Sequence, residues 1–172
     1  MNQLTLILIN ALLVILTFVL AVFIFMLFQF FWGAPFEPSN KMIVRKMIKL
    51  SGNLKGKRAV DLGSGDGRIV CELAKEGADA YGIENNPFLV AYSRTRFLFL
   101  GRKAKIIFNS FWGEDLRKYD IILLFQVNYV MERLGVKIKR ECRRGTLIVS
   151  HHWKFPNLKL KKEIDDIYVY EV

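Results

Sequence analysis

Three glycines at alternate positions, Gly63, Gly65 and Gly67, separate a short apolar stretch from a run of apolar residues at helical spacing. Glycine lets the backbone turn sharply and approach a ligand with no Cβ in the way. Asp61, which precedes the loop, can bind a cationic amine. The free N–H groups and positive dipole end of the following helix can bind a carboxylate. The segment is therefore suited to a ligand that carries both an amine and a carboxylate.

The spacing of the glycines separates two classes of ligand. Dinucleotide-binding loops have the spacing G-x-G-x-x-G and hold a pyrophosphate. Here the spacing is G-x-G-x-G, and one acid before the loop and another inside it would repel a pyrophosphate. An amine and a carboxylate on one carbon form the amino-acid end of S-adenosylmethionine (SAM), so we expect SAM to be the cofactor. The expected contacts in this segment are Asp61, Gly63, Ser64, Gly65, Asp66 and Gly67.

Two further strand ends extend this predicted site. Residues 80–84 are an apolar stretch ending in Glu84, at about the interval from the first acid at which ribose hydroxyls are bound in nucleotide-binding β-α-β units. Asn85 follows it, and Ser110 and Phe111 follow the third predicted strand. We expect all four residues to contact the cofactor. The competing interpretations are a solvated strand end for Glu84 and core packing for Phe111.

Four segments carry a resemblance to a known family: Pro35–Ser39, Asp61–Val70, Ile83–Val90 and Leu147–His151. The chain resembles the class I SAM-dependent methyltransferases. More closely, it resembles the small protein-lysine methyltransferases that act on the adenine nucleotide translocase and the ATP synthase c subunit, with their archaeal relatives. The glycine loop specifies only the superfamily, whereas the Pro-x-x-Pro and Glu-x-Asn-Pro runs point to the family. Related enzymes commonly have an acid where this chain has Ser110, which weakens the expected adenine contact.

Alternating apolar and helical patterns predict a compact, doubly wound, Rossmann-like α/β sheet. The expected strands are 58–61, 80–84, 105–109, 120–127 and 146–153. The expected helices are 39–52 with Ser39 as N-cap, 67–76, 87–100, and 130–143 with a break near Gly135. Two C-terminal strands, 158–164 and 167–172, are expected to form an antiparallel meander or a degenerate form of the usual hairpin, in a departure from the superfamily pattern.

The N-terminal segment predicts a membrane anchor. Leu4–Phe28 contain no charged residue. This uncharged run is longer than the ~20 residues that cross a bilayer as a helix. No Lys or Arg precedes the run, which argues against a cleaved signal peptide, and a core helix is seldom apolar on every face. Phe30, Phe31 and Trp32 fit an aromatic belt. We expect an anchor in residues 1–32, a linker and leading helix in 33–52, and the methyltransferase domain in 53–172.

The chain is basic, with a formal net charge of +10 and a pI near 9.7. The basic residues follow the apolar run and none precedes it, so the positive-inside rule predicts a single-pass protein with a cytoplasmic catalytic domain. Basic residues next to a membrane favour contact with an anionic lipid surface. Nucleic-acid binding is the competing interpretation of the charge, but no recognition module for it is present, and we do not expect it.

The cysteines and histidines predict no metal site. Cys71 and Cys142 are far apart in sequence, and reduced thiols are the default in a cytosolic domain. His151 and His152 are adjacent on a predicted strand and are therefore expected to point to opposite faces.

The resemblance implies a lysine side chain of a membrane-associated protein as the methyl acceptor. Asn128 and Tyr129, after the fourth predicted strand, and Trp153, at the end of the fifth, are the candidate residues for the acceptor slot. Gln126 and His151 are further candidates, with Pro35–Ser39 folding over the top. Two alternatives remain open: a methyltransferase acting on a lipid amine, quinone or other lipophilic molecule, and a non-catalytic SAM-binding scaffold at the membrane. The sequence does not set the oligomeric state.

Overall fold

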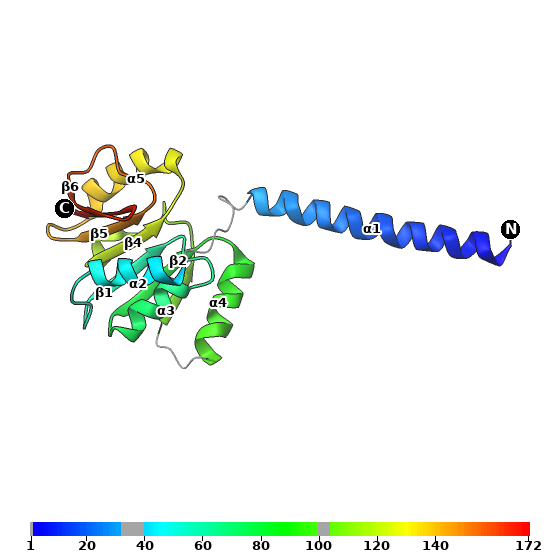
Figure 1. The fold of residues 1–172 in the computed structure, drawn as a ribbon, viewed down its shortest axis with the longest axis horizontal. Helices are drawn as coiled ribbons and strands as arrows, with labels where there is room; N and C mark the ends of the chain where they lie inside the picture. Colours follow the sequence, from blue (N-terminus) through cyan, green and yellow to red (C-terminus); the bar gives the residue numbers. More distant parts are fainter. Residues whose placement is uncertain (1, 32–39, 100–103) are drawn as a thin grey trace. The chain divides into compact units, whose positions relative to one another are not determined.

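The computed structural model describes residues 2–31, 40–99 and 104–172 (Figure 1). Packing divides the chain into two units, residues 1–35 and 36–172. The first unit contains one long helix, α1 (Gln3–Phe31). Residues 32–39, which include the Pro-x-x-Pro segment and the aromatic-belt residue Trp32, lie outside the described residues.

The second unit alternates helices and strands along the chain (Figure 1). Its elements are α2 (Lys41–Leu50), β1 (Arg58–Leu62), α3 (Arg68–Lys75), β2 (Asp79–Glu84), α4 (Pro87–Phe99), β3 (Ala104–Phe108), the 3₁₀ turn η1 (Leu116–Lys118), β4 (Ile121–Phe125), α5 (Asn128–Glu141), β5 (Leu147–His151), β6 (Leu160–Ile164) and β7 (Ile167–Glu171).

The strands form one sheet in the order β3-β2-β1-β4-β5-β7-β6. The five strands from β1 to β5 pair in parallel, and β7 is antiparallel to both β5 and β6. The chain runs outward from β1 to β3 and then returns to place β4 on the other side of β1. In such sheets the ligand binds beyond the carboxyl ends of the strands at this reversal. The predicted doubly wound α/β fold is confirmed, and the residues 61–67 lie at the reversal.

Each face of the sheet has its own hydrophobic core. α2, α3 and α4 pack on one face, where Met47, Val70 and Phe97 meet residues such as Leu123 of β4. On the other face η1 and α5 pack against the alternate strand residues, and the core includes Leu134. The parallel strands are covered on both sides, which explains why their sequences are almost continuously apolar.

The C-terminal strands keep a hairpin rather than a meander. β7 lies between β5 and β6, with Ser150 opposite Tyr168. The expected meander, which would place β6 beside β5, is therefore wrong. The expected departure from the superfamily pattern is wrong as well. Asp165 and Asp166 make the turn with φ of 47° and 58°. A two-residue hairpin turn whose twist matches that of the antiparallel strands needs positive φ at both central residues. Asp165 and Asp166 meet this requirement.

Two local expectations are corrected by the structure. α5 is continuous, so the break near Gly135 is wrong. A Cβ at Gly135 would overlap the side chain of Asn157, whose amide donates to Glu132 O at 2.9 Å, so close packing of the loop after β5 accounts for this glycine. The N-cap of α2 is Asn40, whose side chain accepts from Met42 N, and not Ser39.

Candidate functional site

The glycine loop is bound to the end of the neighbouring strand. Gly63, Gly65 and Gly67 have φ of 77°, 52° and 74°, in the left-handed region that favours glycine. Gly63 N and Ser64 N both donate to Ile83 O of β2, at 2.9 and 3.0 Å. The loop therefore lies over the carboxyl ends of β1 and β2, with its backbone in a conformation that side chains would disfavour.

Neighbouring side chains also require two of these glycines. A Cβ at Gly63 would overlap the amide of Gln126, which donates to Leu62 O at 2.7 Å. A Cβ at Gly67 would lie 2.7 Å from the Phe97 ring of α4. The loop is thus packed between the residue that follows β4 on one side and α4 on the other.

Asp61 is a buried carboxyl group at the end of β1. It is 2% exposed. Burial first, and then the nearby charges of Glu84 and Asp66, raise the pKa of Asp61 from 3.8 to about 8. A cationic group bound beside it would favour the charged carboxylate. The site therefore contains a buried acid that becomes more stable as an anion when a cation is present.

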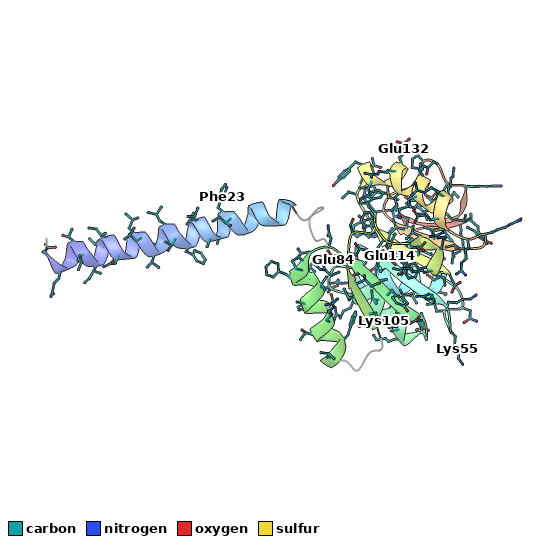
Figure 2. The ribbon with its side chains drawn as sticks, turned by 180° about the vertical axis from the view of Figure 1, so that it is seen from behind. Phe23, Lys55, Glu84, Lys105, Glu114 and Glu132 are labelled. Atoms are coloured by element: carbon teal, nitrogen blue, oxygen red, sulfur yellow. The ribbon has the colours of Figure 1, made fainter. Side chains whose placement is uncertain are left out.

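Glu84 joins the glycine loop to the start of α4, at the end of the sheet opposite Lys55 (Figure 2). Its Oε2 accepts from Gly65 N at 2.8 Å. Its Oε1 accepts from Asn85 N at 3.0 Å and from Asn86 N at 2.8 Å. A carboxylate has about four acceptor positions, so about one remains. Acceptance from two ligand hydroxyls would require the Gly65 amide to release Glu84.

Asp66, which the sequence analysis assigned to the cofactor, is bound to other parts of the protein. Asp66 forms ion pairs with Arg68 at 2.8 Å and Arg96 of α4 at 3.0 Å. Burial raises the pKa of Asp66, but the hydrogen bonds and charges of these arginines outweigh it and hold that pKa below its usual range. Ser64 is buried against Gly82 of β2, and its hydroxyl has no hydrogen-bond partner among the described residues. Asp66 therefore holds the loop against α4, whereas the Ser64 hydroxyl is free to meet a ligand.

The sequence analysis missed the support that α4 gives to the loop. Ser93 is fully buried, and its hydroxyl lies 2.8 Å from both Gly65 O and Leu89 O, between which its single proton is shared. Arg96 Nη1 reaches the backbone carbonyl of Asp66 at 3.2 Å. A serine at helical spacing between the buried apolar residues Val90 and Phe97 is the sequence signal that could have revealed this contact.

The end of β3 brings Ser110 and Phe111 to the same edge of the sheet. Asn109 N donates to Glu84 O at 3.1 Å, which connects this loop to the end of β2. Ser110 Oγ lies 3.4 Å from Trp112 N. Phe111 is half-buried, packs against the core under α5, and lies 4.8 Å from the Trp112 ring. The loop that carries Ser110 and Phe111 is therefore joined to the end of β2 through a backbone hydrogen bond, and neither side chain is hydrogen-bonded to Glu84.

The other half of this edge carries aromatic rings. Asn128 and Tyr129 begin α5 directly after β4, and Tyr129 is 79% exposed. The ring centroids of Phe125 and His151 are 4.6 Å apart. Trp153 is half-buried and lies 4.8 Å from the His152 ring.

The expectation that the two histidines point to opposite faces of a strand is wrong. β5 ends at His151, and His152 has a φ of 73°. The two imidazole centroids are 6.1 Å apart, and the Phe125 ring lies near both. Among the described residues, no cluster of three or more His, Cys, Asp or Glu could hold a metal ion.

The N-terminal unit is one apolar helix. Within α1, Gln3–Ile24 have a mean hydropathy of 3.0, and none of that segment is buried, as its projecting Phe23 illustrates (Figure 2). By length and composition it is the one helix in the described part of the chain that could cross a membrane.

Comparison with known proteins gives a consistent result. Residues 61–162 match the model of the ANTKMT methyltransferase domain. The mouse lysine N-methyltransferase of the ATP synthase c subunit is 33% identical over 144 residues, covering 80% of this chain and 58% of that protein. The chain thus spans little more than half the length of this relative. A protein-lysine N-methyltransferase of Saccharolobus islandicus is 28% identical, covering 76% of this chain and 83% of that protein.

A solved structure supports the same fold. An RNA methyltransferase from Salinibacter ruber, in complex with S-adenosyl-L-homocysteine, aligns with a TM-score of 0.73 and 26% identity. The alignment covers 78% of this chain and 92% of that one.

Proposed function

The chain belongs to the family of ANTKMT methyltransferase domains, and we propose that it is a SAM-dependent protein-lysine N-methyltransferase held at a membrane by its N-terminal helix. The observation that carries the proposal is the arrangement at the carboxyl edge of β1 and β2. There the hydrogen bond from Gly65 joins the glycine loop to the carboxylate of Glu84, and the buried Asp61 lies close enough for the charge of Glu84 to raise its pKa.

The residues present fit the methyl donor. Asp61 is a buried carboxyl group that a ligand ammonium would stabilise as an anion. The glycines leave the loop open to close approach, and Glu84 keeps an acceptor position for a ribose hydroxyl. We assign donor binding to these residues with Ser64, Asp66, Asn85, Ser110 and Phe111, and Asp66 also supports the loop through its ion pairs with Arg68 and Arg96. When bound, SAM supplies an electrophilic methyl group on a sulfonium sulfur.

The acceptor is proposed to be a lysine on a membrane-associated protein. The mouse relative is named for a lysine of the ATP synthase c subunit, and the archaeal relative for protein lysine. A lysine must lose a proton before its nitrogen can attack, and a slot that excludes water lowers its pKa. Asn128, Tyr129 and Trp153, at the ends of β4 and β5, are the proposed slot residues.

The membrane arrangement has two parts. We propose that residues 1–32 anchor the chain, that 33–52 connect it, and that 53–172 catalyse on the cytoplasmic side. Lys41, Arg45 and Lys49 are exposed on one face of α2 at four-residue spacing. Basic residues beside an anionic membrane contribute ~1 kcal/mol each. This face of α2 is therefore the proposed contact with anionic lipid.

The acceptor is tested by labelling. Membranes and RNA from source cells that lack the enzyme are incubated with the full chain and methyl-labelled SAM. The label should enter membrane protein, and mass spectrometry should locate it on lysine. Label recovered in the lipid extract or in RNA would replace the lysine proposal and leave the donor site intact. No label anywhere, with normal SAM binding, would support a non-catalytic scaffold.

The anchor is tested by truncation. A protein that begins at Gly33 should be soluble and bind SAM with unchanged affinity. It should methylate the membrane acceptor more slowly, because tethering no longer raises the effective concentration. Loss of SAM binding would show that the apolar helix supports the catalytic fold, which contradicts the proposed division.

A further inference from the structure

We propose that Phe125, His151, His152 and Trp153 form the site that receives the acceptor amine, and that the left-handed turn at His152 is the positioning element of that site. The inference rests on the proposed methyl transfer to an amine. It adds Phe125 and His152 to the earlier candidates His151 and Trp153 and gives the four side chains a common role. We refer to these four side chains as the ring cluster.

The strand register places the ring cluster beside the donor site. Leu62, Leu124 and Ser150 lie abreast in β1, β4 and β5, and Phe125 pairs with His151 one position further on. Neighbouring strands are about 4.8 Å apart, so Phe125 and His151 lie about one and two strand spacings from the glycine loop. The loop's other flank is occupied by β2 and Glu84. The ring cluster is therefore on the flank that donor binding leaves open.

Gln126 connects the two flanks. Its amide donates to Leu62 O at 2.7 Å and lies against Gly63, while the preceding residue, Phe125, belongs to the ring cluster. The end of β4 is thus in contact with the donor loop and with the rings at the same time. A group bound against the rings would be a close neighbour of the loop.

The backbone at His152 is unusual for a residue with a side chain. Trp153 N donates to His151 O at 3.0 Å, and His152 has a φ of 73°, which together describe a γ-turn of the positive-φ type. This turn is rare and strained. Glycine would adopt it at no steric cost, and the other non-glycine residues with positive φ among those described are the two aspartates of the β6–β7 hairpin.

The strained turn is held by its surroundings. His152 N donates to Asp166 O at 2.8 Å, and the hydroxyl of the fully buried Ser150 donates to Trp153 O at 2.8 Å. The result is that both imidazoles lie near Phe125 instead of on opposite faces of a strand. Backbone strain that is maintained by specific contacts is concentrated at functional sites, and its effect here is to gather rings at the carboxyl edge.

The chemistry of the ring cluster suits an amine. The faces of Phe125 and Trp153 can attract an ammonium group. None of the four side chains is a carboxylate, so the cluster adds no negative charge that would hold the amine in its protonated form. Rings also displace water, and desolvation lowers the pKa of an amine. A lysine chain in this position would be both bound and brought closer to its nucleophilic form.

The experiment compares variants of the full chain, with membranes from cells that lack the enzyme as the acceptor and labelled SAM as the donor. His152→Gly keeps the turn and removes the imidazole. Phe125→Leu removes a ring without removing the apolar volume. Asp165→Gly is the matched control, because it also replaces a left-handed residue and affects only an exposed ion pair with Lys46.

Phe125→Leu should lower kcat/KM for the membrane acceptor about tenfold, mainly through KM, as expected for a lost cation–π contact in a desolvated site. His152→Gly removes an exposed imidazole and should lower kcat/KM in the same direction, by about threefold. The SAM dissociation constant should change by less than about twofold. Asp165→Gly should match wild type in both measurements. Calorimetric SAM binding also reports whether each variant is folded.

The outcomes separate this inference from the proposed function. Lysine methylation at the wild-type rate in both His152→Gly and Phe125→Leu would overturn the ring cluster and leave the methyltransferase proposal standing. Label from the wild-type protein in lipid or RNA would instead overturn the lysine proposal. Equal loss of SAM affinity and methylation in both variants would show that these rings support the donor loop, which also contradicts the inference.

Discussion

The two halves of the sheet's carboxyl edge are built on different principles. The β1–β2 half consists of backbone amides and acids: Gly65, Asn85 and Asn86 all donate to the single carboxylate of Glu84. The β4–β5 half carries the ring cluster, in which both imidazoles lie near Phe125, and none of its four side chains is an acid. The first half is suited to a polar, charged donor, and the second to an amine that must lose its proton.

The halves also differ in how they are supported. The donor half is formed mainly within residues 61–86, where one loop and the next strand contact each other directly. Ser93 and Arg96 of α4, and Gln126 after β4, give it further support. The acceptor half depends on Asp166 and Ser150, which hold the turn at His152 from β5 and the C-terminal hairpin. Changes at the turn of His152 should therefore leave the donor half intact, although Gln126 contacts the donor loop from the end of β4.

The largest effect is expected from Glu84→Gln. The variant keeps the shape of the side chain but presents an amide NH₂ that cannot accept from both flanks, so the Gly65 amide or the Asn85 and Asn86 amides lose their acceptor. Hydrogen bonds to a charged group contribute ~1.5–3 kcal/mol each, so SAM affinity should fall about 100-fold by calorimetric titration. Glu132→Gln, an exposed acid on α5, is the control. Wild-type affinity in Glu84→Gln would remove the basis for the donor half.

Asp61→Asn should weaken donor binding and stabilise the protein. The pKa of Asp61 is raised from 3.8 to about 8 in the folded state, so between these values the folded protein holds a proton that the unfolded chain has lost. Stability from this group is present at low pH and is lost as the pH rises through that window. Asparagine cannot ionise and avoids the loss.

The measurement is thermal unfolding of wild type and Asp61→Asn at pH 5 and pH 8.5. The variant's Tm should exceed that of wild type by about 5 °C at the higher pH, and the difference should shrink at pH 5. SAM affinity should fall about tenfold, because the ligand ammonium loses its counter-charge. An equal Tm difference at both pH values would contradict a buried acid with a raised pKa.

Ser93→Ala tests whether the donor loop depends on α4. The substitution removes the donor to Gly65 O from a fully buried position. One neutral hydrogen bond contributes about 1 kcal/mol, so SAM affinity should fall about fivefold with methylation reduced in proportion. Thr95→Ala is the matched control, since Thr95 makes the same bond to the carbonyl four residues earlier, Ala91 O, and does not touch the loop. A Ser93→Ala variant with normal affinity would show that Glu84 alone orders the loop.

Much of the donor half could be predicted from the sequence because its contacts are local. Gly63 and Gly67 require positive φ, and an acid at the end of the next strand is a short-range pattern. The doubly wound α/β class also follows from apolar runs that alternate with helical patterns. What local pattern could not reveal is which acids are already paired: Asp66 is held by Arg96, thirty residues away in the chain, and its assignment as a direct ligand contact remains a prediction.

The acceptor half was harder to predict because a turn of one residue decides it. An alternating strand would have sent His151 and His152 to opposite faces, and nothing in the residue types of 150–153 signals a positive φ. The turn depends on Asp166 O, a contact that exists only once β7 has been placed between β5 and β6. Gly135 illustrates the same point, because its role is set by Asn157 from another element and not by helix propensity.

The smallest effect is expected from Tyr129→Phe, which sharpens the boundary of the acceptor half. Tyr129 is 79% exposed at the start of α5, so its hydroxyl is at the rim and not among the rings. Removing the hydroxyl should lower kcat/KM for the membrane acceptor about twofold and leave the SAM dissociation constant unchanged. Tyr92→Phe is the control, an exposed tyrosine of α4 outside the acceptor half. A tenfold or larger loss in Tyr129→Phe would mean that the acceptor crosses the start of α5 and hydrogen-bonds there, so that the amine would be oriented by a hydroxyl at the rim instead of by rings at the end of β5.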